Sequence, residues 1–198
     1  MKIAVLAWGS LVWDRRELAI AEAFRANGPD LPVEFCRVSC DGRLTLVIDE
    51  AVETSCQTYS ALSAHDDLDA ALENLWVREG SKDERLPRHI RKSGRVGFVD
   101  VAAREANATA IERHPRSVEA INAWAAANDY DAVIWTALAS NFHEPERAAE
   151  PFSVDAAISY LEALEAVKRG AALRYIRSAP PEIQTLVRAA VNARWPEG

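Results

Sequence analysis

Glycine, proline and cysteine are scarce in this sequence of 198 residues, and each shortage excludes a class of protein. With only 8 Gly and 9 Pro, the chain is neither collagen-like nor a low-complexity linker. Its 49% of apolar residues exclude intrinsic disorder. A chain of this length buries roughly 70% of its unfolded surface, so we expect one domain spanning residues 1–198.

Basic residues and long apolar runs are also in short supply. The 30 acidic and 23 basic residues give a net charge of −7, which repels a phosphate backbone, so we expect no nucleic-acid partner. The longest strongly apolar run, residues 3–8, is far shorter than the ~20 residues of a membrane span, and we expect no membrane partner. No signal-peptide pattern precedes it, and the odd number of cysteines (Cys36, Cys40 and Cys56) favours reduced thiols, so a cytoplasmic location is expected.

Several apolar runs predict strands. Residues 2–8 and 131–139 are continuous apolar runs, typical of strands buried on both faces. Residues 33–40 and 43–49 flank Asp41-Gly42, the dipeptide that a type I′ turn prefers, and predict a hairpin. Two further strands are predicted at residues 56–62 and 95–101.

Helices are predicted between and after these strands. A capping-box pattern at Asp14 predicts a helix over residues 14–27. A second helix follows Ser63 and Asp66, with apolar residues on one face: Leu68, Ala71, Leu72, Leu75 and Trp76.

The second half of the chain is dominated by helical patterns. Residues 81–94 are highly charged without a clear period, and we expect an exposed loop there. A short helix is predicted at residues 117–127, and residues 153–198 form a helical C-terminal segment with breaks near Gly170 and at Pro180-Pro181. The predicted fold class is therefore α+β, a small mixed β-barrel or curled sheet flanked by helices.

Two segments carry features from which chemistry is expected. At residues 8–13 (WGSLVW), Gly9 and Ser10 stand where a buried strand turns out into a loop, so adjacent backbone N–H groups can cradle an anion such as a carboxylate. At residues 75–80 (LWVREG), Glu79 lies at a helix end beside large apolar residues, a setting that favours proton transfer. The alternatives are an ordinary turn and a solvated helix end closed by Gly80.

Taken together, the order of these segments resembles the gamma-glutamylcyclotransferase superfamily (ChaC-like and GGCT-like proteins). Residues 8–13 are similar to the family's YGSL-type loop, and residues 37–48 (RVSCDGRLTLVI) to its following strand pair. Residues 59–63 (YSALS) resemble a further family element, and residues 78–80 (REG) the pair that carries its acid/base glutamate. The resemblance covers about the first half of the chain.

The resemblance implies an enzyme, of transferase or lyase type, that cleaves a γ-glutamyl amide. The α-amine attacks the side-chain carbonyl, 5-oxoproline forms, and an amine leaves. Glu79 would be the general acid/base, and the loop amides from Gly9 to Leu11 would hold the substrate; no cofactor is required. This would place the protein in γ-glutamyl and glutathione metabolism, although no glycine- and proline-bearing segment points to glutathione itself.

Other residues complete the predicted site. Trp8 stands where the family usually has tyrosine, which points to weaker activity or a different substrate. Trp13 flanks the predicted pocket, and Asn141 follows a buried strand at a position where it faces a ligand or caps a loop. The four histidines lack the paired spacing of a zinc site, and no metal is expected. The alternatives are a catalytically inactive small-molecule binding or scaffold protein of the same fold, or an amide hydrolase that uses water.

Overall fold

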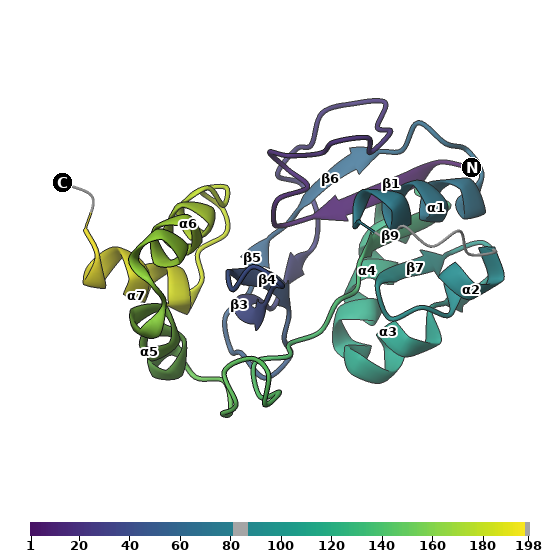
Figure 1. Cartoon of the computed structure of the whole chain (residues 1–198). Helices are drawn as coiled ribbons and strands as arrows, with labels where there is room; N and C mark the ends of the chain where they lie inside the picture. Colours follow the sequence, from purple (N-terminus) through teal and green to yellow (C-terminus); the bar gives the residue numbers. More distant parts are fainter. Residues whose placement is uncertain (81–86, 197–198) are drawn as a thin grey trace. The chain divides into compact units, whose positions relative to one another are not determined.

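The computed structural model describes residues 1–80 and 87–196, and its contacts divide the chain into two units. The first comprises Met1–Leu31 and Gln57–Leu138, and the second comprises Pro32–Cys56 and Ala139–Gly198. Each unit has its own sheet and its own helices (Figure 1). We expected one domain over residues 1–198. The division into two units neither confirms nor contradicts this, so it stays a prediction.

A five-stranded mixed sheet forms the centre of the first unit. Its strands are β6 (Tyr59–Leu62), β1 (Ile3–Ala7), β9 (Ala132–Thr136), β7 (Val96–Asp100) and β8 (Glu105–Ala106), in that order. The pair of β1 and β9 is parallel and the other pairs are antiparallel. The predicted α+β class is confirmed, but a closed barrel, one of the two predicted forms, is absent from the described part of the chain.

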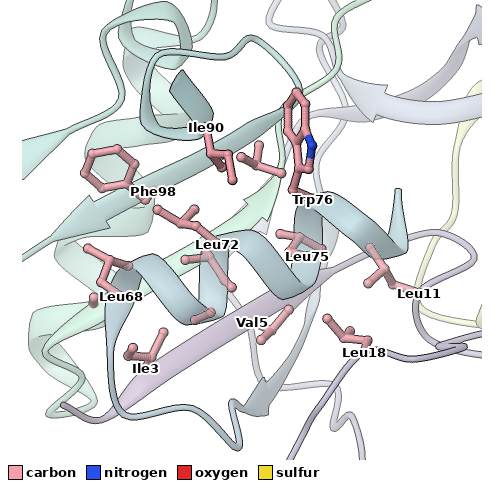
Figure 2. Close-up of a cluster of buried hydrophobic side chains, with 14 of the residues drawn as sticks. Ile3, Val5, Leu11, Leu18, Leu68, Leu72, Leu75, Trp76, Ile90 and Phe98 are labelled. Carbon is pink, nitrogen blue, oxygen red and sulfur yellow. The ribbon is translucent and has the colours of Figure 1, made fainter. Parts of the chain in front are cut away.

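Helix α1 (Leu68–Arg78) packs against one face of this sheet (Figure 2). The helix begins at Asp67, whose side chain accepts a hydrogen bond from the N–H of Ala70 at 2.9 Å, so the cap lies later than the predicted Ser63. Its five predicted apolar residues are all buried, and they pack on Ile3 and Val5 of β1. This cluster fixes the orientation of the helix and therefore the position of its last residues.

The opposite face of the sheet is covered by α3 (Ala108–Arg113) and α4 (Pro115–Ala127). Both helices contact β7, and α4 also contacts β9. Successive residues of a strand point to opposite faces, so burial of Ala4 between Ile3 and Val5 shows that β1 is covered on both sides. The predicted helix at 117–127 is confirmed with an earlier start, and α3 was not predicted.

The predicted exposed loop at residues 81–94 is wrong in part, because α2 (Pro87–Arg91) lies within it. Ile90 of this helix is buried at 1% exposure in the same cluster as α1. Helix α2 has one large apolar side chain among charged ones, and this does not make a helical periodicity from which a helix could be predicted. Residues 81–86 lie outside the described residues.

The predicted helix over residues 14–27 is wrong, because this segment runs alongside β6. Isolated bridges join Ile20 to Ser63 and Arg25 to Ser60. The side chain of Asn74 on α1 accepts from the N–H of Ala19 at 2.8 Å and donates to the carbonyl of Glu17 at 3.0 Å. These hydrogen bonds replace those of a helix, and the segment covers an edge of the sheet that would otherwise be unpaired.

Gly97 of β7 lies opposite Trp135 of β9, which is 1% exposed. A Cβ atom at Gly97 would come within 2.5 Å of the indole ring. We therefore expect Gly97→Ala to lower the free energy of unfolding by about 1–3 kcal/mol, measured by urea denaturation.

Gly170→Ala is the matched control for Gly97→Ala. Its nearest neighbour is the flexible end of Arg174 at 3.5 Å, within a helix, so this change is expected to stabilise by roughly 0.5–1 kcal/mol. Equal effects of the two substitutions would contradict the close packing of Gly97 on Trp135.

The second unit is built on the hairpin of β3 (Val33–Val38) and β4 (Leu44–Ile48), as predicted. The type of turn differs from the prediction. Gly42 has a φ of +84° but Asp41 has no positive φ, whereas a type I′ turn needs both. The Gly42 N–H donates to the carbonyl of Ser39 at 3.0 Å, which makes a longer loop.

Two very short strands, β2 (Asp30–Leu31) and β5 (Cys56–Gln57), lie where the chain crosses between the units. The predicted strand at 56–62 is thus split into β5 and β6. Thr58 separates them, and its hydroxyl donates to the carbonyl of Pro29 at 2.7 Å.

Three helices complete the second unit: α5 (Val154–Ala163), α6 (Ala166–Arg177) and α7 (Leu186–Arg194). The helical C-terminal segment and the break at Pro180-Pro181 are confirmed. The break predicted near Gly170 is wrong, because Gly170 lies inside α6 and the chain breaks at Leu164 instead. In the described part of the chain, no helix has the length and apolarity required to cross a membrane.

A buried carboxylate of β3 holds the start of α7. Glu34 is 0% exposed, and its Oε2 accepts from the N–H groups of Leu186 at 3.0 Å and Val187 at 3.3 Å. Its Oε1 accepts from the N–H of Phe35 at 2.7 Å. Burial raises the pKa of this carboxyl, although its hydrogen bonds oppose that effect.

Candidate active site

Glu79, the predicted acid/base residue, lies at the C-terminal end of α1. Its N–H donates to the carbonyl of Leu75 at 3.0 Å, so the residue still belongs to the last helical turn. Gly80 follows with a φ of +76°, a conformation that suits glycine and ends the helix. The Glu79 side chain is only 11% exposed, so the carboxylate is not a solvated helix end.

The loop at residues 8–13 leaves β1 as a tight turn. The N–H of Val12 donates to the carbonyl of Gly9 at 3.0 Å, and the N–H of Asp14 donates to that of Ser10 at 2.7 Å. Within the described residues, the N–H groups of Gly9, Ser10 and Leu11 donate no hydrogen bond. Successive amides that lack acceptors among the described residues are a feature of backbone anion sites, and an anion site at this loop stays a prediction.

Arg78 joins the two predicted segments. Its Nη1 donates to Oε1 of Glu79 at 2.6 Å, and its Nη2 donates to Oγ of Ser10 at 3.3 Å and to the carbonyl of Asp14 at 2.5 Å. The Arg78 side chain is 5% exposed. The carboxylate and the loop therefore lie within reach of one buried guanidinium group, which fixes both.

The role of Arg78 was missed from the sequence. Arg78 follows Leu75 by three residues. This spacing places it in line with the apolar residues on the buried face of α1. An arginine at such a position needs hydrogen-bond partners when it is buried. The helical spacing was thus a signal that could have identified it.

Arg95 brings a second guanidinium group to the same helix end. Its Nη1 donates to the backbone carbonyl of Glu79 at 3.0 Å, and the group lies 5.7 Å from the Trp76 ring centroid. A cation is favourable at the C-terminus of a helix, where backbone carbonyls lack helical partners. Arg95 thus stabilises the backbone conformation that presents the Glu79 carboxylate.

The Glu79 carboxylate retains one oxygen for chemistry. Oε1 is bound to Arg78, whereas Oε2 accepts no hydrogen bond within residues 1–80 and 87–196. A carboxylate fixed through one oxygen can exchange a proton through the other. The arrangement can therefore bind an anionic group at the loop amides and transfer a proton nearby.

The other predicted residues of the first unit differ in exposure. Trp8 and Leu11 are 4% and 6% exposed, and Leu11 belongs to the cluster that packs on α1 (Figure 2). The buried side chain of Leu11 anchors the turn on this cluster. Trp13 is 39% exposed at the end of the turn.

Asn141 has a structural role in the second unit. Its Oδ1 accepts from the N–H of Val38 at 2.8 Å and its Nδ2 donates to the carbonyl of Val38 at 3.1 Å. The side chain thus pairs with the N–H and the carbonyl of one residue, as the backbone of a neighbouring strand would. It is 2% exposed. Asn141 belongs to the second unit and Glu79 to the first, and the hydrogen bonds of each lie within its own unit.

In the part of the chain that the structure describes, no three His, Cys, Asp or Glu side chains are grouped as metal ligands. Comparisons with protein-family models, with curated proteins and with solved structures find no match to this chain.

Proposed function

We propose that this chain has a gamma-glutamylcyclotransferase-like fold and cleaves a γ-glutamyl amide with release of 5-oxoproline. One observation carries the proposal: buried Arg78 donates hydrogen bonds both to the Glu79 carboxylate and to Ser10 of the turn at residues 8–13. The two segments on which the resemblance rests are thus neighbours in space, although 68 residues separate Arg78 from Ser10. A glutamate exposed elsewhere on the unit would have removed the basis for this proposal.

The substrate would be held by the turn. The N–H groups of Gly9, Ser10 and Leu11, which donate no hydrogen bond among the described residues, would bind the α-carboxylate of the γ-glutamyl group, since adjacent amides suit an anion. Fixing this end places the α-amine and the side-chain carbonyl of the same group in range for ring closure. Such an intramolecular reaction needs no second reactant, and its main demand is orientation.

Glu79 would move the proton that the reaction must transfer. The α-ammonium group first loses one proton to the solvent. Its nitrogen then attacks the γ-carbonyl carbon and forms the ring C–N bond while Oε2 takes a second proton from that nitrogen. The bond from this carbon to the leaving nitrogen then breaks, and the same oxygen returns the proton to that nitrogen. Arg78 remains protonated throughout and keeps Oε1 fixed.

The experiment is incubation of the protein with a panel of γ-glutamyl amino acids and γ-glutamyl amines, followed by chromatographic detection of 5-oxoproline. We expect 5-oxoproline and free amine in equal amounts from at least one compound. The matched control is the same compound acetylated on its α-amine, which cannot cyclise and should give no product.

Two outcomes would overturn the proposal. Glutamate instead of 5-oxoproline would identify an amide hydrolase that uses water at the same carboxylate. Absence of product from the whole panel, combined with saturable binding of the compounds, would identify a binding protein that lacks catalysis.

A further inference from the structure

The second unit contains a cavity of about 540 Å³ that the proposed reaction does not use. It lies between the tip of the hairpin and helices α5 and α6, and all its lining residues belong to the second unit. Its volume falls within the range of about 300–1,000 Å³ that is usual for small-molecule sites.

The hairpin tip is a fixed wall of this cavity. The Tyr160 hydroxyl donates to the carbonyl of Gly42 at 2.9 Å, which ties α5 to the tip. Burial raises the pKa of Tyr160, so this hydroxyl keeps its proton and remains a donor. The Ser39 hydroxyl and Arg43 both bind the Asp41 carboxylate, at 2.5 and 2.7 Å. The cavity is therefore formed before any ligand arrives.

Cations with unused hydrogen-bonding capacity face this cavity. The Lys168 ammonium has no hydrogen bond or ion pair among the described residues. Among the described residues Arg147 makes two long contacts, at 3.5 Å from Nη1 to the carbonyl of Ser39 and 3.9 Å from Nε to Glu144. The negative charge of Asp41 is compensated by Arg43, so an incoming anion meets two cations and the exposed Glu146.

Apolar side chains line the rest of the cavity. Val38 and Leu164 contribute from the hairpin and the end of α5, and Val167 and Ala171 from α6. Val167 is 83% exposed, so its side chain is open to contact with a ligand. A ligand without apolar groups would leave these apolar side chains exposed to water.

We propose that this cavity is a second binding site, for a small molecule with one anionic head group and an apolar body. Arg147 and Lys168 bind the head group, and the apolar body covers Val167. The site lies entirely in the second unit, so it is independent of the Glu79 chemistry.

Cys40 provides a reporter for this site. It lines the cavity and is exposed, whereas Cys36 and Cys56 are buried at 0% and 3% exposure. The uncharged reagent 4,4′-dithiodipyridine should therefore react first with Cys40 in the native protein. Burial raises the pKa of the Cys36 thiol. This keeps the thiol protonated and makes it less reactive still.

The probe is 4-phenylbutyrate, and its uncharged counterpart is 4-phenylbutanamide. We expect the acid to slow the reaction of Cys40 in a saturable manner, by about fivefold when it is present at roughly four times its Kd. The amide should protect far less. Equal protection by acid and amide would overturn the assignment of the two cations to the head group.

Lys168→Glu is the decisive variant, and Lys92→Glu is its matched control, an exposed lysine of the first unit. Reversal of charge at residue 168 is expected to weaken protection by roughly tenfold, while the Lys92 variant behaves as the parent. Unchanged protection in Lys168→Glu, or no saturable protection in the parent, would overturn the proposal. Either result leaves the proposed 5-oxoproline reaction unaffected.

Discussion

Glu79→Gln is expected to lower the rate of 5-oxoproline release by roughly 10²–10⁴-fold. Glutamine has nearly the same shape and its carbonyl oxygen can still accept the hydrogen bond from Arg78, now 2.6 Å from Oε1. It cannot take a proton from the α-amine or return one to the leaving nitrogen. The measurement is kcat on the best substrate of the panel, by chromatography of the product.

Glu73→Gln is the matched control for this variant. Glu73 lies on the exposed side of the same helix, so its replacement should leave kcat unchanged. Substrate binding through the turn amides should survive in Glu79→Gln, because Ser10 remains held by Arg78. A Glu79→Gln variant as active as the parent would show that this carboxylate is not the acid/base group.

Glu34→Ala is expected to have the largest effect on stability, a loss of about 2–4 kcal/mol in the free energy of unfolding. The substitution removes the acceptor for three backbone N–H groups, the buried ones of Phe35 and Val187 and the partly buried one of Leu186, the last two at the start of α7. It also empties a position that is 0% exposed. Urea denaturation followed by circular dichroism is the measurement.

The loss caused by Glu34→Ala is expected to depend on pH. Because burial raises the pKa of Glu34 above its ordinary value near 4.5, the native protein keeps a proton that the unfolded chain releases. The stability contributed by Glu34 is then fully present below about pH 4.5 and decreases as the pH rises through the raised pKa. The difference between parent and variant should therefore be larger at pH 5 than at pH 8.

Glu53→Ala is the control for these measurements, because Glu53 is an exposed carboxylate of the same unit. It should change the unfolding free energy by less than about 0.5 kcal/mol at either pH. A Glu34→Ala difference that grows with pH would contradict the raised pKa. A loss no larger than that of the control would contradict the role of Glu34 in holding α7.

Elements with strong local signals were predictable from the sequence. The hairpin of β3 and β4 follows from two apolar runs around Asp41-Gly42, and α1 follows from five apolar residues at helical spacing. In both cases the local preference and the tertiary packing favour the same structure. Neither prediction required knowledge of what the element contacts.

Elements decided by distant partners were not predictable. Residues 14–27 carry a helical start signal, yet Asn74 and the edge strand β6 offer their backbone a competing set of hydrogen bonds. Gly170 interrupts the helical pattern of the sequence but costs a helix only ~1 kcal/mol, which packing of α6 on β4 offsets.

The candidate site was predictable only as two separate segments. Glu79 and the turn at Gly9 were selected from the sequence, but nothing local shows that they meet. Their connection is a tertiary contact made by Arg78, a residue that resembles an ordinary charged helix end. Asn141 was predicted to face a ligand because its actual partner could not be read from the local sequence. That partner is the backbone of Val38, 103 residues away.

The division of the chain into units has a consequence for synthesis. The hairpin of the second unit is made early, but the helices that contact it, α5, α6 and α7, are made last. During translation the whole first unit is completed while the apolar face of that hairpin still lacks its helices, a period in which an uncovered strand pair is open to aggregation. The link from Glu34 to Leu186 closes over 152 residues, so this contact is among the slowest to form.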